Sequence, residues 1–137
     1  MWNLSKDCSF SLKEKAPPPP PSGKETLEHK LVITPLEDRL KVLVEVSTPE
    51  DTTLPYAFRV GYEGVFFLEA EETERRPSAE EVQRIGFVNC GAIVYPFLRA
   101  FVADLTMRAT GQPLLLPPVN FVKLFRRKVQ EKAAAAR

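Results

Sequence analysis

The fold is decided by residues 93–109, which read IVYPFLRAFVADLTMRA. On a helical wheel at about 100° per residue, Arg99 and Thr106 fall on one narrow polar strip. Asp104 and Arg108 fall on the opposite strip, four residues apart, where opposite charges attract. The flanks between the strips are apolar, one bulky (Val94, Leu98, Phe101, Val102, Leu105) and one smaller (Ile93, Ala100, Ala103, Met107). A helix with two apolar flanks is expected to be buried on two sides.

The second flank needs a partner, because a chain of 137 residues has little left to cover it. The simplest partner is another copy of the chain, since small alanine side chains let helices approach closely. We therefore predict a homo-oligomer whose helices lie between sheets. The candidate oligomer interface consists of Ile93, Ala100, Phe101, Ala103 and Met107. The alternative is that the last helix of the same chain covers this flank.

The residues before this helix predict the sheet that its bulky flank covers. Apolar and polar residues alternate in four segments, the pattern of half-buried strands. These segments are residues 4–12, 27–33, 40–46 and about 55–70. Residues 35–38 supply a turn, and Gly61 and Gly64 suggest a bulge in the fourth strand. The pattern predicts an α+β fold, a four-stranded antiparallel sheet covered by two principal helices.

Helix signals follow the last strand. Ser78 and Glu81 have the spacing of a capping box, which opens a short helix. We expect Pro96 in the first turn of a second, longer helix, where its missing N–H costs little, and Gly111 at the end of that helix. A last amphipathic helix is expected to start near Asn120.

The length predicts one domain, residues 1–137. Five consecutive prolines at 17–21 give a stiff, extended crossover loop over residues 16–23. A spacer between strands is the simpler interpretation, and a ligand for a proline-binding module is the alternative. The alanine-rich tail, about residues 133–137, is expected to fray.

The composition is typical of a soluble globular protein. The formal net charge of +1 gives no strong field that would attract nucleic acid or an anionic membrane. Cys8 and Cys90 match no metal-ligand spacing and fit a reduced, cytosolic protein. The first 15 residues lack an apolar signal-peptide core, and residues 91–105 are too short and too charged to span a membrane. We expect a cytoplasmic location without direct membrane insertion.

No recognisable catalytic set is present in the sequence. His29, the one histidine, lies at an apparently half-buried strand position, where a structural role is typical. Glutamates within residues 69–74 could do acid–base chemistry, but a solvated loop is the simpler interpretation. Residues 61–64 match a GxxG nucleic-acid clamp, but Glu63 would repel phosphates. We expect that the chain is not an enzyme and that it binds no metal, cofactor or nucleic acid. The alternative is a structural or nucleic-acid-associated protein that uses the basic run 126–128.

Residues 113–119, which read PLLLPPV, form a strongly apolar stretch. Their prolines keep them out of helix and sheet, and three leucines must pack against or bind something. A rigid, extended segment of this kind is suited to line a groove that recognises extended polypeptide with little sequence selectivity.

Several of these stretches together resemble the SecB family of bacterial protein-export chaperones. The specific part of the resemblance comprises residues 95–97 (YPF) with Arg99, 104–106 (DLT) with Arg108, 114–121 (LLLPPVNF) and 124–125 (LF). The strand residues Gly64-Val65-Phe66 and Lys6-Asp7 with Ser9-Phe10 resemble the family more weakly. The resemblance extends over nearly the whole chain in the right order.

The resemblance implies a SecB-like tetramer, built as a dimer of dimers. It also implies a chaperone that binds unfolded, export-bound proteins without ATP and delivers them to the translocase motor SecA. The client-binding groove carried over from the family consists of Leu31, Ile33, Phe97, Leu114, Leu116, Phe121, Leu124 and Phe125. For each of these residues, ordinary packing in the core is the alternative.

The chain departs from the family at the acidic sheet face that docks SecA. The matching positions are Asp7, Ser11 and Arg59, so one acid is kept, one is neutral and one is reversed. Docking between charged surfaces depends on complementary signs. The departure favours an alternative role, a SecB-like chaperone that protects an antitoxin in a toxin–antitoxin system.

Overall fold

The computed structural model describes residues 2–13, 27–67 and 78–136 of the chain. The proline-rich loop expected at 16–23 and the glutamates at 69–74 lie outside these residues. Four strands form one antiparallel sheet in the order β1-β4-β3-β2. The strands are β1 (Trp2–Leu12), β2 (Glu28–Pro35), β3 (Arg39–Ser47) and β4 (Tyr56–Phe67). The predicted α+β fold with a four-stranded antiparallel sheet is confirmed.

One face of the sheet carries the core. Alternate residues of β3 are buried, as their pattern predicts; these are Leu40, Val42, Val44 and Val46. The predicted turn between β2 and β3 is present, and the Leu36 amide donates a hydrogen bond to the Arg39 carbonyl at 2.8 Å. The strand periodicity therefore identifies correctly which face the helices cover.

The predicted bulge in β4 is wrong. Pairing with β1 is unbroken from Trp2↔Phe66 to Leu12↔Tyr56, and pairing with β3 is equally regular. Gly64 lies on the buried face, where an added Cβ would come within 3.0 Å of Val94 Cγ2. The glycine is therefore there to let the long helix approach the strand, and the GxxG stretch is part of a regular strand.

The helices expected as separate elements are one continuous helical run. It comprises α1 (Ala79–Arg84), the π-helical turn η1 (Ile85–Cys90) and α2 (Gly91–Thr110). The capping box at Ser78 is confirmed, as is the end of the run at Gly111, which has φ of 80°. The placement of Pro96 in a first turn is wrong, because the run begins well before it and Pro96 lies inside α2.

Gly86 lies inside this run, in η1, where the helix packs closely on the sheet. An added Cβ there would lie 2.9 Å from Ile33 Cγ2 and 2.9 Å from Leu40 Cδ2, so the glycine serves contact with the sheet. The run over residues 79–110 is long and apolar enough to cross a membrane, unlike the shorter stretch expected from the sequence. However, 44% of its most apolar part is buried within the fold, and a core helix meets the same criteria.

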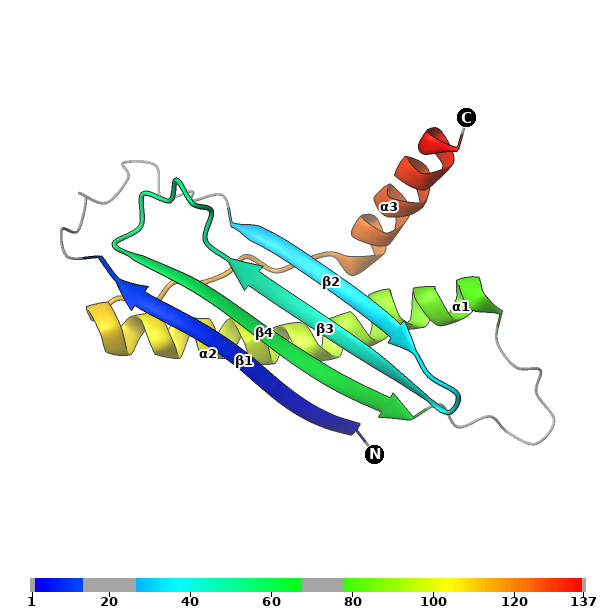
Figure 1. Ribbon diagram of the computed structural model, residues 1–137, viewed down its shortest axis with the longest axis horizontal. Helices are drawn as coiled ribbons and strands as arrows, with labels where there is room; N and C mark the ends of the chain where they lie inside the picture. Colours follow the sequence, from blue (N-terminus) through cyan, green and yellow to red (C-terminus); the bar gives the residue numbers. More distant parts are fainter. Residues whose placement is uncertain (1, 14–26, 68–77, 137) are drawn as a thin grey trace.

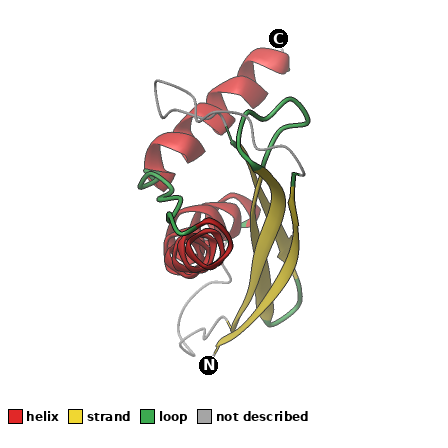
Figure 2. Cartoon of the chain, turned by 90° about the vertical axis from the view of Figure 1, so that its left-hand side faces the viewer, coloured by secondary structure: helices red, strands yellow, loops and turns green. Residues whose placement is uncertain are grey.

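The sheet and the long helix form two layers, which Figure 2 shows end on. The bulky flank of α2 faces the sheet as predicted, with Val94, Leu98 and Val102 fully buried. The second flank is open in the described chain, with Ile93 44% and Met107 49% exposed. The alternative that the last helix covers this flank is therefore wrong.

The last helix, α3 (Phe121–Ala135), projects away from the two layers beside α1. Its start is as predicted, because the Asn120 side chain accepts a hydrogen bond from the Lys123 amide at 3.1 Å. The helix extends through Ala135, and fraying of the alanine run stays a prediction.

Candidate functional site

A groove of about 500 Å³ opens between β2, α3 and the segment that connects α2 to α3. We call it the β2–α3 groove, and residues 111–120 the connecting segment. Its lining residues are His29, Lys30, Leu31, Val44, Phe87, Tyr95, Pro117, Pro118, Val119, Asn120, Phe121, Lys123, Leu124, Arg127 and Lys128. The floor is apolar and aromatic, and the rim facing α3 is basic.

Aromatic packing fixes the floor. The ring centroid of Phe121 lies 6.4 Å from that of Phe87 and 5.8 Å from that of Tyr95, both in edge-to-face arrangements. Gly91 lies beneath this cluster, and an added Cβ would come within 3.1 Å of both Leu31 and the Phe121 ring. Close approach at Gly91 therefore brings β2, the long helix and α3 together at the floor.

Side chains of α2 hold the connecting segment by its backbone. The Tyr95 hydroxyl donates to the Pro117 carbonyl (2.6 Å), Arg99 Nε donates to the Leu116 carbonyl (2.6 Å), and the Leu114 amide donates to Thr106 Oγ1 (2.7 Å). Burial raises the pKa of the Tyr95 hydroxyl, and Arg99 partly opposes this shift. The hydroxyl is therefore protonated and able to donate at neutral pH.

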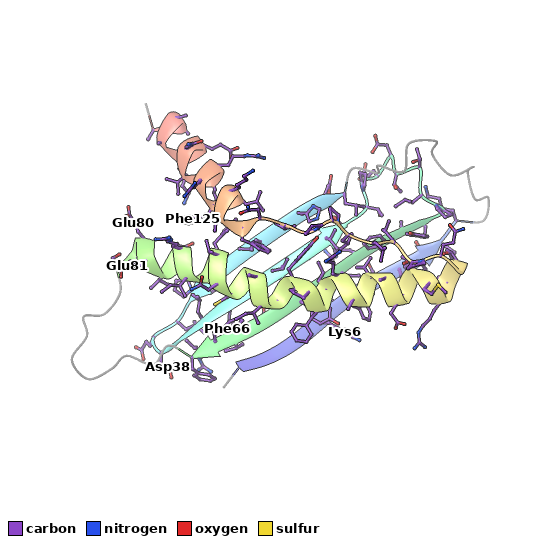
Figure 3. The ribbon with its side chains drawn as sticks, turned by 180° about the vertical axis from the view of Figure 1, so that it is seen from behind. Lys6, Asp38, Phe66, Glu80, Glu81 and Phe125 are labelled. Carbon is purple, nitrogen blue, oxygen red and sulfur yellow. The ribbon has the colours of Figure 1, made fainter. Side chains whose placement is uncertain are left out.

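Three of the expected client-binding residues come together in this groove, namely Leu31, Phe121 and Leu124. Phe125 lines a neighbouring cavity of about 590 Å³ between α1 and α3, beside Glu80 and Glu81 (Figure 3). We call it the α1–α3 cavity. The client-binding role of these four residues stays a prediction.

The other four expected client-binding residues lie elsewhere. Leu116 is 1% exposed and belongs to the core, and Ile33 and Leu114 are partly buried against it. Phe97 is exposed and lines a shallow pocket with Tyr62 and Phe101, apart from the β2–α3 groove. The structure therefore does not bring all eight residues into one groove.

Sequence reasoning missed several residues of the groove, above all Phe87 and Tyr95. These two aromatic residues are eight positions apart, two turns of one helix face, so a signal was present. This spacing does not stand out in the sequence, because Pro96 suggests that the long helix begins after Phe87. Of the basic lining residues, Arg127 and Lys128 belong to the run 126–128, which the sequence connects only with a nucleic-acid-associated alternative, and Lys123 carries no signal of its own.

The expected SecA-docking positions share the outer face of the sheet. Asp7, Ser11 and Arg59 are all exposed, and they alternate with the residues that face the core. In the sheet, Asp7 is paired with Gly61, and Arg59 is paired with Ser9. The structure thus places these positions on one surface of mixed charge, and docking there stays a prediction.

The candidate oligomer interface is mostly open in the described chain. Ile93, Ala100 and Met107 are exposed, and Ala103 is half-buried. Phe101 differs from these, because it packs against the sheet. The centroid of the Phe101 ring lies 5.9 Å from that of Tyr62 and 4.2 Å from the ammonium of Lys6, which Figure 3 labels. The role of all five residues in assembly stays a prediction.

The titratable groups near the groove form no catalytic arrangement in the described part of the chain. His29 is exposed, not half-buried as expected, because the groove leaves this end of the edge strand β2 uncovered. Burial raises the pKa of the Cys90 thiol to about 11, so this group is a neutral thiol at neutral pH. In residues 2–13, 27–67 and 78–136, no cluster of three or more His, Cys, Asp or Glu residues could hold a metal ion.

Comparisons with known proteins agree on one family. The family model "Preprotein translocase subunit SecB" matches residues 25–132. The protein-export protein SecB of Maricaulis maris is 31% identical over 103 residues, which cover 73% of this chain and 56% of the relative. That of Acinetobacter baumannii is 33% identical over 107 residues, which cover 78% and 65%. The chain thus spans little more than half the length of the first of these relatives.

A solved structure shows the same fold. The SecB-like chaperone of Mycobacterium tuberculosis, in complex with a ChAD peptide from the HigA1 antitoxin, is similar with a TM-score of 0.65. The similarity covers 87% of this chain and 84% of that one, at 18% sequence identity. From the family model, the matching relatives and the shared fold, we conclude that the chain belongs to the SecB family.

Proposed function

We propose that the chain is an ATP-independent holding chaperone, working in the cytoplasm, that binds unfolded, export-bound preproteins and passes them to the translocase. The observation that carries this proposal is the β2–α3 groove, with an apolar floor and an extended wall, in a chain of the SecB family. An unfolded protein exposes apolar side chains that such a floor can bury. Holding a client in this way requires no chemical step by the chain.

The edge strand β2 adds a second means of holding extended polypeptide. It ends the sheet order β1-β4-β3-β2, so one side of its backbone has no partner among the strands of the described residues. His29, Lys30 and Leu31 of this strand line the groove. A client segment lying along β2 would gain backbone hydrogen bonds that do not depend on its sequence. This geometry supports broad selectivity for unfolded chains.

The open flank of α2 supports self-association, which would supply one contact of a homotetramer built as a dimer of dimers. The flank presents the exposed side chains of Ile93 and Met107, which are 44% and 49% exposed in the described chain. Exposed apolar surface of this extent is typical of an interaction site. A second copy would bury it against an identical flank, because the most common oligomers are symmetric.

The export role and the antitoxin-protecting role differ in the partner to which the chaperone would bind. Delivery to SecA would use the outer face of the sheet, where Asp7 and Arg59 carry opposite charges. This mixed charge favours the second candidate, a chaperone that protects an antitoxin. The similar Mycobacterium tuberculosis chaperone, which was solved with an antitoxin peptide, supports the same candidate.

The holding function is tested by light scattering behind size exclusion, with a slowly refolding client and no nucleotide. We expect a tetramer-sized species that retains the chemically unfolded client and ignores its folded form, which serves as the control. A monomer that retains no client would refute both the oligomer and the holding function. If holding is found, calorimetric titration with SecA and with an antitoxin then separates the two delivery roles.

A further inference from the structure

The charges around the β2–α3 groove have one sign. Helix α3 carries five basic residues and one acidic residue. Three of these basic residues, Lys123, Arg127 and Lys128, line the groove, and none of its lining residues in the described part of the chain is an aspartate or glutamate. The whole chain has 19 basic and 18 acidic residues, so this excess is local and does not reflect the net charge.

The three cations are available to a ligand. None of them forms an ion pair with a carboxylate of the described residues, where the ion pairs are Arg39–Asp38 and Arg108–Asp104. The ammonium of Lys128 lies 5.3 Å from the centroid of the Phe87 ring, so its charge is held above the aromatic floor. Lys30 also lines the groove, but in the register of β2 and β3 it lies opposite Glu45, which carries the opposite charge.

We propose that the groove selects polypeptide segments in which apolar or aromatic residues are flanked by aspartate or glutamate. This selectivity rests on the proposed holding function and adds a charge preference to it. Apolar side chains of the segment fill the floor between Leu31 and Phe121, and its carboxylates meet Lys123 and Arg127 at the rim. Segments flanked by lysine or arginine are repelled by the same rim.

The floor is why we favour a polypeptide over a nucleic acid. The Phe87, Tyr95 and Phe121 rings are only 7%, 4% and 8% exposed, so they offer little ring face on which successive bases could stack. Apolar contacts on such a floor suit aliphatic and aromatic side chains. The positive end of the α3 dipole, near Asn120, also favours carboxylates at the groove.

The test uses fluorescently labelled peptides that share one apolar and aromatic centre and differ only in their flanks, which are acidic, neutral or basic. Anisotropy titrations with the full chain at low salt should give the tightest binding for acidic flanks and the weakest for basic flanks. For three exposed ion pairs we expect acidic flanks to bind about threefold to thirtyfold more tightly than neutral ones. Added salt should reduce this preference.

Two neighbouring arginines provide a matched pair of variants. Arg127→Glu changes the groove rim, whereas Arg126→Glu makes the same charge change at a residue that lines neither this groove nor the α1–α3 cavity. We expect Arg127→Glu to remove most of the acidic preference and Arg126→Glu to keep it. Circular dichroism should show both variants folded, because both positions are exposed on α3.

The contrary outcomes are distinct. Equal binding of the three peptides, or equal loss in the two variants, would overturn the charge preference and leave the holding function standing. Equally tight binding of an acidic peptide without the apolar centre, or of single-stranded DNA, would overturn it in favour of general polyanion binding. Failure of every peptide to bind would overturn the holding function and the preference together.

Discussion

Thr106 shows how much one buried hydroxyl does at the residue scale. It is fully buried on α2, where its Oγ1 donates to the Val102 carbonyl at 2.8 Å and accepts from the Leu114 amide at 2.7 Å. Together with Arg99 and Tyr95, it ties the connecting segment to the helix. The polar strip on the helical wheel, Arg99 and Thr106, therefore carries the side chains that hold the connecting segment against α2.

Thr106→Val should loosen this attachment. Valine has the same shape but cannot accept a hydrogen bond, so the Leu114 amide loses its partner in a partly buried position. We expect the free energy of unfolding to fall by about 1–3 kcal/mol, as measured by urea denaturation. Thr34→Val, at an exposed strand position, is the control and should change stability little. An unchanged urea midpoint for Thr106→Val would contradict the attachment.

Cys90 gives a prediction about pH. Its pKa is raised from 9.0 to about 11 by burial, so folding favours the neutral thiol. A group with a raised folded pKa stabilises the fold fully below its unfolded pKa and loses this contribution as the pH rises through the folded value. We therefore expect the wild-type protein to lose stability relative to Cys90→Ala between about pH 9 and pH 11. Parallel stability curves for the two proteins across this range would show that the thiol does not titrate as expected.

At the scale of elements, the glycines of β4 set the distance between the strand and the long helix. Gly64 faces Val94 of α2 on the buried side, and Gly61 lies on the outer side near Leu43. The two residues look alike in the sequence, where both suggest a bulge. Only the contacts with other elements separate their roles.

Gly64→Ala should therefore destabilise the fold more than Gly61→Ala. The added methyl group would lie 2.7 Å from a ring carbon of Phe66 and 3.0 Å from Val94, so side chains must shift. We expect a loss of about 1–3 kcal/mol for Gly64→Ala, the usual cost of overpacking. At Gly61 the nearest atom is the flexible end of Leu43 at 3.3 Å, and the loss should be smaller. Thermal denaturation of both variants checks this order.

Local patterns predicted the elements whose signals are local. The strand alternation, the capping box at Ser78 and the end of the helix at Gly111 depend on neighbours in sequence, and all three are confirmed. The bulge was wrong because Gly64 serves a tertiary contact, and the separate start of the long helix was wrong because the helical run continues from α1 through η1 past Pro96. The groove was only partly predictable, since Leu31, Phe87 and Phe121 meet only after the sheet and the helices pack.

On the scale of the whole molecule, the long helix has one apolar flank in the core and one apolar flank exposed. Its bulky flank covers the sheet, and its second flank carries apolar side chains in the open. The helical wheel predicts both flanks, because the direction in which a side chain leaves a helix depends on its position in the sequence. The described chain leaves this second flank exposed, and no local pattern in the sequence specifies a partner for it.

Ala100→Glu tests the proposed assembly. A glutamate in the middle of a helix-to-helix contact would be buried without a partner, which disfavours association strongly. We expect a shift from tetramer towards smaller species by light scattering, while circular dichroism stays unchanged because Ala100 is exposed in the chain. Thr34→Glu, which adds the same charge on the sheet, should leave the mass unchanged. A tetramer that persists in Ala100→Glu would place the assembly contact elsewhere.

The way the connecting segment is held has a consequence for evolution and engineering. Its anchors run from side chains of α2 to main-chain atoms at Leu114, Leu116 and Pro117, so they do not read the identity of the segment's own side chains. Leu115, between two anchored positions, is 71% exposed. Substitutions at such outward positions can therefore change the exposed surface of the segment while its backbone attachment to α2 stays the same. The segment should therefore tolerate changes of sequence at its outward positions without loss of its attachment.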